Sequence, residues 1–352
     1  MSTVFVRTRQ RSQVTTLARC ISVITLTMVA FGGVIGAAAQ DGTPAASPMA
    51  TSTIAAGMTF GLIQKSGDQQ YFVDEARGFR EVIEANGGEV IVQDVQLDAS
   101  AAINAVDTMI GTGVAGIAIV VPDQQIGPAV IDKAKAANIP LIALDDGIKD
   151  SSGADNPFAG FDGTDMGTKV GEAAVQLWQD SGWESDGVGA LSIEVESLTV
   201  CNDRTDATRM LMTDAGFPEA NIQQVPYDGT SPNAIDAAST VVTAHPEFTK
   251  WLVWACNDEG VQGGIRALES AGITAENTIG VGLGAYLACP EWKSGNPSGF
   301  KAALYISGVD VGQSGAQALL DAAINGTPLP PSTVAPTTMT TPENYEEAGV
   351  VC

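Results

Sequence analysis

The stretch WLVWACNDEGVQGGIRAL, residues 251–268, indicates the fold class of the chain. Its apolar run ends at Asn257-Asp258, and apolar residues then recur at i, i+4 and i+7 from Val261, the spacing of one helix face. The stretch predicts a strand, a polar tip and a helix that Asp258 can cap. Ligands of open α/β sheets bind beyond the carboxyl ends of the strands, so Asn257 is a candidate ligand-binding residue. The alternative is that Asn257-Asp258 only stops the strand and caps the helix.

Predicted strands and helices alternate on both sides of this stretch. Continuous apolar runs are typical of parallel strands that helices cover on both faces. The first predicted unit has strands at 58–63, 89–95, 115–121 and 139–144, with helices at 72–86, 100–111 and 124–138. The second has helices at 165–181, 203–215 and 233–245 and strands at 187–193, 222–226 and 278–282, besides the opening stretch. Later segments at 301–305, 309–324 and 333–338 form no unit of their own and are expected to return to these two.

Composition and charge narrow the class of protein. The chain has 352 residues, of which 45% are hydrophobic and 16% charged, which suits an α/β protein of about two domains. Residues 1–39 combine four arginines, no acid, an apolar run and an Ala-x-Ala ending, which predicts a secretory signal peptide. Cleavage is favoured over retention as an anchor, and Cys20 precedes the apolar run, so no lipid anchor is predicted. Residues 40–57, rich in Ala, Pro, Ser and Thr, are predicted to be a flexible linker.

The net charge and the single histidine argue against several functions. The net charge of −24 becomes −28 when the four signal arginines are removed, so a nucleic-acid partner is not expected. His245 is the sole histidine, which leaves no plausible base for a serine or cysteine nucleophile. Four cysteines remain outside the signal, and exported thiols usually pair, with three possible connectivities. Their spacing matches no zinc motif, and neither a metal nor a cofactor is expected.

Several strings in the chain resemble the extracytoplasmic sugar-binding proteins of ABC transporters, the type I periplasmic binding proteins. They are IPLIALDD from Ile139, AGFPEANIQQVP from Ala215, HPEFTKWL from His245 and ND-x-x-V-x-GG-x-RA from Asn257. The resemblance extends over about residues 60–326 and is greatest to the L-arabinose-binding members of that family. It implies a monomer that captures a small carbohydrate and delivers it to a membrane ABC permease.

The resemblance also implies the architecture. The family folds as two doubly wound parallel-sheet lobes joined by a three-segment hinge and closes over its ligand. The implied lobe I comprises residues 58–161 and 307–335. The implied lobe II comprises residues 162–306 and 336–352.

Site residues follow from the same resemblance. Lys65 is expected to donate to a sugar hydroxyl, Asp146 to accept from two hydroxyls with Asp145 supporting it, and Arg204 to grip a ring oxygen and a neighbouring hydroxyl. Tyr71 is expected to cover the sugar together with Phe72. The whole implied set is Lys65, Gln69, Tyr71, Phe72, Asp145, Asp146, Phe161, Leu198, Arg204, Asn257 and Gly284.

Four of these positions depart from the arabinose pattern. Gln69 stands in place of a glutamate, Tyr71 of a tryptophan, Phe161 of a methionine and Gly284 of an asparagine. A sugar hydroxyl left unpaired by such a loss costs about 1–3 kcal/mol. The departures favour a different pentose or hexose, a deoxysugar or a polyol.

The resemblance bears on the cysteines too. It places Cys201 and Cys256 near the cleft, which favours disulfides 201–256 and 289–352. The alternative at the first pair is two unpaired buried thiols.

Other functions are weighed against this interpretation. A sensor or chemoreceptor-type signalling protein of the same fold is the main alternative, and a gene neighbourhood with permease genes would favour uptake. An enzyme is not expected, because residues 60–67 lack G-x-G-x-x-G and no P-loop occurs. Adjacent Asp145 and Asp146 on one strand would point to opposite sides and would not flank a glycosidic bond. A sugar-responsive repressor would carry a DNA-binding helix-turn-helix where this chain has its export signal.

Overall fold

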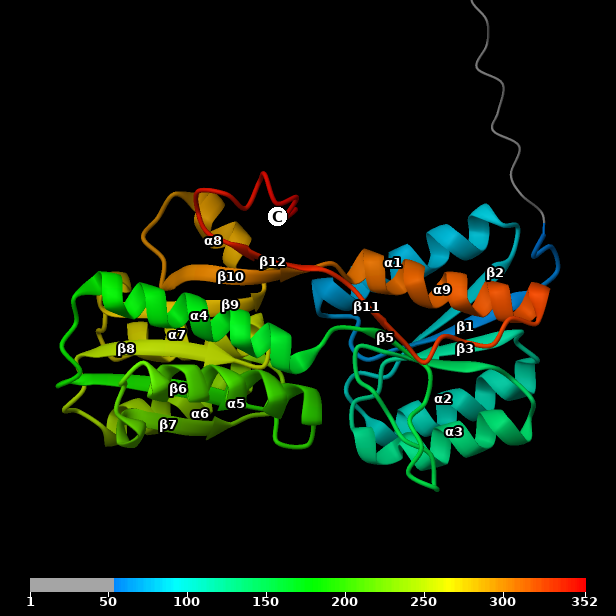
Figure 1. The fold of residues 1–352 in the computed structure, drawn as a ribbon, viewed down its shortest axis with the longest axis horizontal. Helices are drawn as coiled ribbons and strands as arrows, with labels where there is room; N and C mark the ends of the chain where they lie inside the picture. Colours follow the sequence, from blue (N-terminus) through cyan, green and yellow to red (C-terminus); the bar gives the residue numbers. More distant parts are fainter. Residues whose placement is uncertain (1–53) are drawn as a thin grey trace, which may run out of the picture. The chain divides into compact units, whose positions relative to one another are not determined.

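The computed structural model describes residues 54–352 and contains two six-stranded sheets (Figure 1). The predicted signal peptide and residues 40–53 of the predicted linker lie outside the described residues. Within the described part of the chain, no helix is both long and apolar enough to cross a membrane.

The first sheet is parallel, with strand order β11-β5-β4-β3-β1-β2. Helices α1 and α9 cover one face and α2 and α3 the other (Figure 1). Its strands are β1 (Thr59–Gln64), β2 (Glu89–Asp94), β3 (Gly116–Ile119), β4 (Leu141–Leu144), β5 (Phe158–Gly160) and β11 (Ser332–Val334). Its helices are α1 (Gln70–Ala85), α2 (Ala99–Thr112), α3 (Gly127–Ala136) and α9 (Gly308–Asn325), with the short η1 (Gln124–Ile126) before α3.

The second sheet repeats this plan with strand order β12-β10-β9-β8-β6-β7, in which only β12 is antiparallel to its neighbour. Its strands are β6 (Val188–Glu194), β7 (Ile222–Pro226), β8 (Lys250–Ala255), β9 (Thr278–Gly284), β10 (Phe300–Ile306) and β12 (Thr337–Thr340). Its helices are α4 (Gly163–Ser181), α5 (Thr199–Asp214), α6 (Ser231–Ala244), α7 (Asp258–Ser270) and α8 (Ala288–Ser294), with η2 (Glu219–Asn221) and η3 (Ala275–Asn277). Helices α4 and α5 pack together on one face, and α6 and α7 on the other (Figure 1).

The chain passes between the two sheets three times, at residues 161–162, at Ser307 and at residues 335–336. The predicted pair of doubly wound parallel sheets is thereby confirmed. Strand β5 and helix α8 were not predicted, because each is short and has no clear periodicity. The predicted segment 333–338 is in fact two strands, β11 in the first sheet and β12 in the second.

Glycines let the helices approach each other closely in both units. A side chain at Gly312 of α9 would lie 2.0 Å from the carbonyl oxygen of Glu75 on α1. A side chain at Gly167 of α4 would lie 2.2 Å from the carbonyl oxygen of Arg204 on α5. A side chain at either position would collide with the backbone of the neighbouring helix. Glycine therefore allows the close packing of the helices that carry candidate site residues.

Two disulfides join the predicted cysteine pairs. Cys201 on α5 pairs with Cys256 after β8, with Cα atoms 4.8 Å apart, and Cys289 on α8 pairs with Cys352, with Cα atoms 5.5 Å apart. Both separations lie in the usual range for disulfides. The structure therefore has the predicted connectivity, and Cys201 and Cys256 are paired with each other in it.

Candidate ligand-binding site

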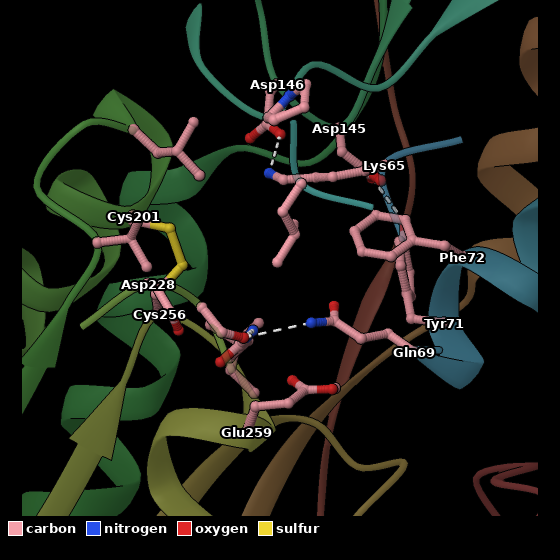
Figure 2. A pocket seen from close by; sticks show the side chains of 18 of the residues that line it. Lys65, Gln69, Tyr71, Phe72, Asp145, Asp146, Cys201, Asp228, Cys256 and Glu259 are labelled. Carbon is pink, nitrogen blue, oxygen red and sulfur yellow. Dashed lines mark hydrogen bonds and ion pairs between the residues drawn. A yellow bond between two sulfur atoms is a disulfide. The ribbon is translucent and has the colours of Figure 1, made fainter. Parts of the chain in front are cut away.

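A cavity of about 360 Å³ lies beyond the carboxyl ends of strands from both sheets (Figure 2). Ten of the eleven implied site residues line it, whereas Phe161 does not. The lining members of that set lie at strand ends or in the first two turns of helices: Lys65, Gln69, Tyr71, Phe72, Asp145, Asp146, Leu198, Arg204, Asn257 and Gly284. Volumes of this size suit a small ligand.

A buried ion pair forms the polar centre of the first-sheet side (Figure 2). Lys65 follows β1, and its Nζ lies 2.7 Å from Oδ2 of Asp146, which follows β4. Both side chains are buried, with 10% and 5% of their surfaces exposed. Since the pair is charged and lines the cavity, it presents both a donor and an acceptor to a ligand.

Asp145 lines the cavity beside Asp146, and the two carboxyl groups have different partners, Tyr71 and Lys65. Strand β4 ends at Leu144, and Asp145 adopts a left-handed backbone with φ of 55°, so strand alternation no longer applies. Its Oδ1 accepts a hydrogen bond from the hydroxyl of Tyr71 at 2.5 Å. Burial raises the pKa of Asp145 to about 7, while the Tyr71 hydrogen bond lowers it.

Asn257 has two roles on the second-sheet side. Its Oδ1 accepts from the backbone N–H of Gly260 at 3.0 Å and so caps α7, and it also accepts from the hydroxyl of Tyr227 at 2.5 Å. Its Nδ2 donates to the carbonyl oxygen of Gly229 at 3.3 Å. The expectation that Asp258 caps this helix was wrong, because Asp258 is its first residue. Asn257 therefore both ends the strand and lines the cavity.

The carboxyl group of Asp258 lies beside the backbone of Gly284. Asp258 is 2% exposed, and its Oδ2 accepts from the N–H of Leu287 at 2.9 Å. Burial raises its pKa to about 6. A Cβ at Gly284 would lie 3.3 Å from the same Oδ2, and its φ of +135° disfavours any side chain.

Arg204 is held against the disulfide on this side. Its Nη1 donates to the carbonyl oxygen of Cys256 at 3.0 Å and lies 3.7 Å from the Sγ of that cysteine. Its Nε is buried and has no hydrogen-bond partner among the described residues. Arg204, Cys201 and Cys256 all line the cavity, so the disulfide and the guanidinium form one part of its wall.

Aromatic rings from both sides meet at the cavity. The Tyr71 ring lies edge-on to Phe72, with centroids 5.2 Å apart, and edge-on to Tyr286, with centroids 5.9 Å apart. The Phe161 ring is 6.5 Å from that of Tyr71 but lies outside the cavity lining. Tyr286 was not predicted. An aromatic residue two positions beyond the end of β9 was the available signal.

The sequence also left out several acidic lining residues. Asp123, Asp228 and Glu259 join Asp145, Asp146 and Asp258, so six acidic residues line the cavity together with Lys65 and Arg204. Figure 2 shows Glu259 on the second-sheet side, its carboxyl group extending into the cavity. Burial, followed by the charge of Asp258, raises the pKa of Glu259 to about 8. This excess of acidic groups disfavours an anionic ligand.

Hydrogen bonds also connect the two sides directly. Nε2 of Gln69 donates to the carbonyl oxygen of Gly229 at 3.2 Å, and Oε1 of Gln124 accepts from the N–H of Thr199 at 2.5 Å. Among residues 54–352 no group of three or more histidine, cysteine or acidic residues is arranged to hold a metal ion. The site is therefore a polar and aromatic cavity formed by both sheets.

Comparisons with known proteins agree with this architecture. A family model described as periplasmic binding protein domain matches residues 60–327. An ABC transporter L-arabinose-binding periplasmic protein of Azospirillum brasilense is 30% identical over 294 residues, 82% of this chain and 88% of the relative. The L-arabinose-binding periplasmic protein of Escherichia coli K12 is 30% identical over 263 residues, 74% of this chain and 80% of the relative. A solute-binding protein of Actinobacillus succinogenes 130z, solved with D-allose, has a TM-score of 0.69 at 20% identity, covering 82% and 99% of the two chains.

Proposed function

The chain belongs to the periplasmic binding protein family, and we propose that it is an exported binding protein that delivers a small carbohydrate to an ABC importer. The curated relatives named above are L-arabinose-binding periplasmic proteins, one of them assigned to an ABC transporter. The observation that carries the proposal is the cavity, in which hydrogen-bonding groups and aromatic rings from both sheets face one space. A sugar requires both, because its hydroxyls donate and accept while its C–H faces pack on rings.

The two sheets with their helices act as lobes in this proposal. Lobe I comprises residues 58–161 and 307–335, and lobe II residues 162–306 and 336–352, with the three crossings as the hinge. Ligand contacts in both lobes supply the preference for a closed form that any closure mechanism needs. The Gln69–Gly229 hydrogen bond connects the lobes at the site itself.

The ligand is a neutral sugar or polyol other than L-arabinose. Gln69 has no carboxylate, and Gly284 offers no side chain, while its φ of +135° and the nearby Asp258 disfavour one. Tyr71, Phe72 and Tyr286 make the remaining wall aromatic. This combination suits a ligand with fewer hydroxyls or a larger apolar face, such as a deoxysugar or a methylated polyol. Six carboxyl groups argue against sugar acids and sugar phosphates.

A thermal-shift screen of the mature chain tests the proposal, with pentoses, hexoses, deoxysugars and polyols as probes and calorimetry on each ligand that shifts the melting temperature. A true ligand at a hundred times its dissociation constant adds about 2.7 kcal/mol to the free energy of unfolding. Arg204→Ala should abolish the shift. A screen in which only amino acids, peptides or lipids stabilise the protein would overturn the carbohydrate assignment.

The preference for a neutral ligand can be tested by comparing a neutral sugar with its own anionic derivatives. For whichever neutral sugar binds, its uronic acid and its phosphate should bind at least tenfold more weakly, because each adds a negative charge among carboxyl groups. An equal or tighter affinity for the anionic form would contradict this part of the proposal.

A further inference from the structure

Glu75 is a buried carboxyl group with no assigned role. It lies on the inner face of α1, is 0% exposed, and neither Oε1 nor Oε2 has a hydrogen-bond partner among the described residues. An ionised carboxylate without a partner is costly in such a place. A third orphaned oxygen lies at the same place, Oδ2 of Asp145.

The geometry brings these orphaned oxygens together. Glu75 is one helical turn after Tyr71 on α1, so both side chains lie on one helix face, and the Tyr71 hydroxyl already bonds Oδ1 of Asp145. Besides burial, the charge of Asp145 and a hydrogen bond with it raise the pKa of Glu75, so the two carboxyl groups are neighbours. Two carboxylates cannot bond each other, but a protonated carboxyl can donate to an ionised one. One proton between them therefore gives a partner to Oδ2 of Asp145.

The groups around the pair decide where the proton resides. Burial raises the pKa of Glu75 well above its ordinary value, and the charges of Asp145 and Asp146 raise it further, while Lys65 lowers it. The Tyr71 hydrogen bond and the charge of Arg204 favour the ionised form of Asp145. On the other side, α9 packs Gly308 and Gly312 against this part of α1, and its Asp310 is exposed. The proton is therefore assigned to Glu75.

We propose that Glu75 is a positioning residue of the ligand site: as a neutral acid it donates to Oδ2 of Asp145 and fixes that carboxylate. Asp145 in turn holds the hydroxyl of Tyr71, whose ring lines the cavity. This inference rests on the proposed function, since Asp145 and Tyr71 act on the ligand. Loss of the proton at high pH places a second negative charge behind Asp145 and loosens the site.

Two substitutions test the role. Glu75→Gln keeps a neutral donor of the same shape, so its ligand affinity at pH 7 should stay within about threefold of the unsubstituted protein and should fall less at high pH. Glu75→Leu keeps the volume but leaves Oδ2 of Asp145 without a donor, and affinity should fall tenfold or more. Glu81→Gln, on the exposed face of the same helix, is the control. An unchanged affinity and pH profile in Glu75→Leu would overturn the proposal.

A measurement without ligand separates this inference from the proposed function. Carboxyl carbon NMR of the mature chain should show a glutamate signal that titrates well above the ordinary range and is absent in Glu75→Gln. If the signal is present but no carbohydrate binds, the proton is assigned correctly and the proposed function fails. If carbohydrate binds but the glutamate titrates normally, the function holds and the role of Glu75 is wrong.

Discussion

The two sides of the cavity are held in place by different chemistry. On the first-sheet side the Lys65–Asp146 ion pair and the Tyr71–Asp145 hydrogen bond position the polar groups. On the second-sheet side the Cys201–Cys256 disulfide joins the helix that carries Arg204 to the strand end that precedes Asn257. The first side is held by an ion pair and a hydrogen bond and the second by a covalent bond, so each can be disrupted without the other.

The largest expected effect follows from breaking the ion pair. Asp146→Ala leaves the buried Lys65 charge without its partner, which should lower the free energy of unfolding by about 3–5 kcal/mol and abolish ligand binding. Chemical denaturation and calorimetry measure the two effects.

A double variant separates those effects. Lys65→Met with Asp146→Leu replaces both charges by apolar groups of similar volume and should restore most of the stability but none of the affinity. Ligand binding by the double variant would remove the pair from the site.

Removing a disulfide should have a smaller effect, and the two disulfides can be compared directly. They close loops of similar length, with sequence separations of 55 and 63, so removing either should cost a similar 2–4 kcal/mol, about the usual range. Only Cys201→Ser with Cys256→Ser should also weaken ligand binding, by tenfold or more, because Arg204 bonds the Cys256 carbonyl. Cys289→Ser with Cys352→Ser is the control, and an equal loss of affinity in both variants would contradict a local role.

A pH dependence should appear on the second side as well. The pKa of Glu259 is raised to about 8, so the folded state keeps a proton that the unfolded chain releases near its ordinary pKa. The resulting stability is complete below that ordinary pKa and is lost as the pH rises through about 8. Between pH 6 and pH 8 the free energy of unfolding should fall by about 1–2 kcal/mol from this group. Glu259→Gln should flatten that portion of the profile measured by urea denaturation, and an unchanged slope would refute it.

The smallest effect concerns the hydrogen bond that joins the sides away from the aromatic rings. Gln124→Ala removes the acceptor for the Thr199 N–H and should weaken ligand binding by about 0.5–1.5 kcal/mol without changing the specificity. The neighbouring exposed Gln125→Ala is the control. Calorimetry at fixed pH compares the two, and identical affinities would show that this contact does not favour the ligand-bound form.

The strand ends of the site could be predicted because each follows an apolar run that stops at a polar residue. Asp145-Asp146 and Asn257 have this pattern, and the structure places all three at the cavity. Tyr286 follows a strand end in the same way, but the direction of its side chain could not be predicted, since it follows Ala285, whose φ of 65° no pattern indicates.

Glu75 shows a signal that was present but not used. It lies between Phe72 and Ala76 on the buried face of α1, where the helical spacing calls for an apolar residue. A charged residue at such a position indicates a buried partner, although sequence alone does not identify Asp145. Glu259 and Asp228 gave no such signal, because acidic residues at helix starts and in turns are common on surfaces.

Gly308 couples the aromatic wall to the crossing at Ser307. Its N–H donates to the hydroxyl of Tyr286 at 3.3 Å, and a side chain on it would lie 2.4 Å from the carbonyl oxygen of Tyr71. One residue without a side chain thus lies against the backbone of Tyr71 and bonds the hydroxyl of Tyr286, directly after the chain has left the second sheet. The mechanical consequence is that a rotation at Ser307 acts directly on the hydrogen bond between Gly308 and Tyr286. The aromatic side chains can be exchanged to suit another ligand, whereas position 308 is restricted to glycine in any such redesign.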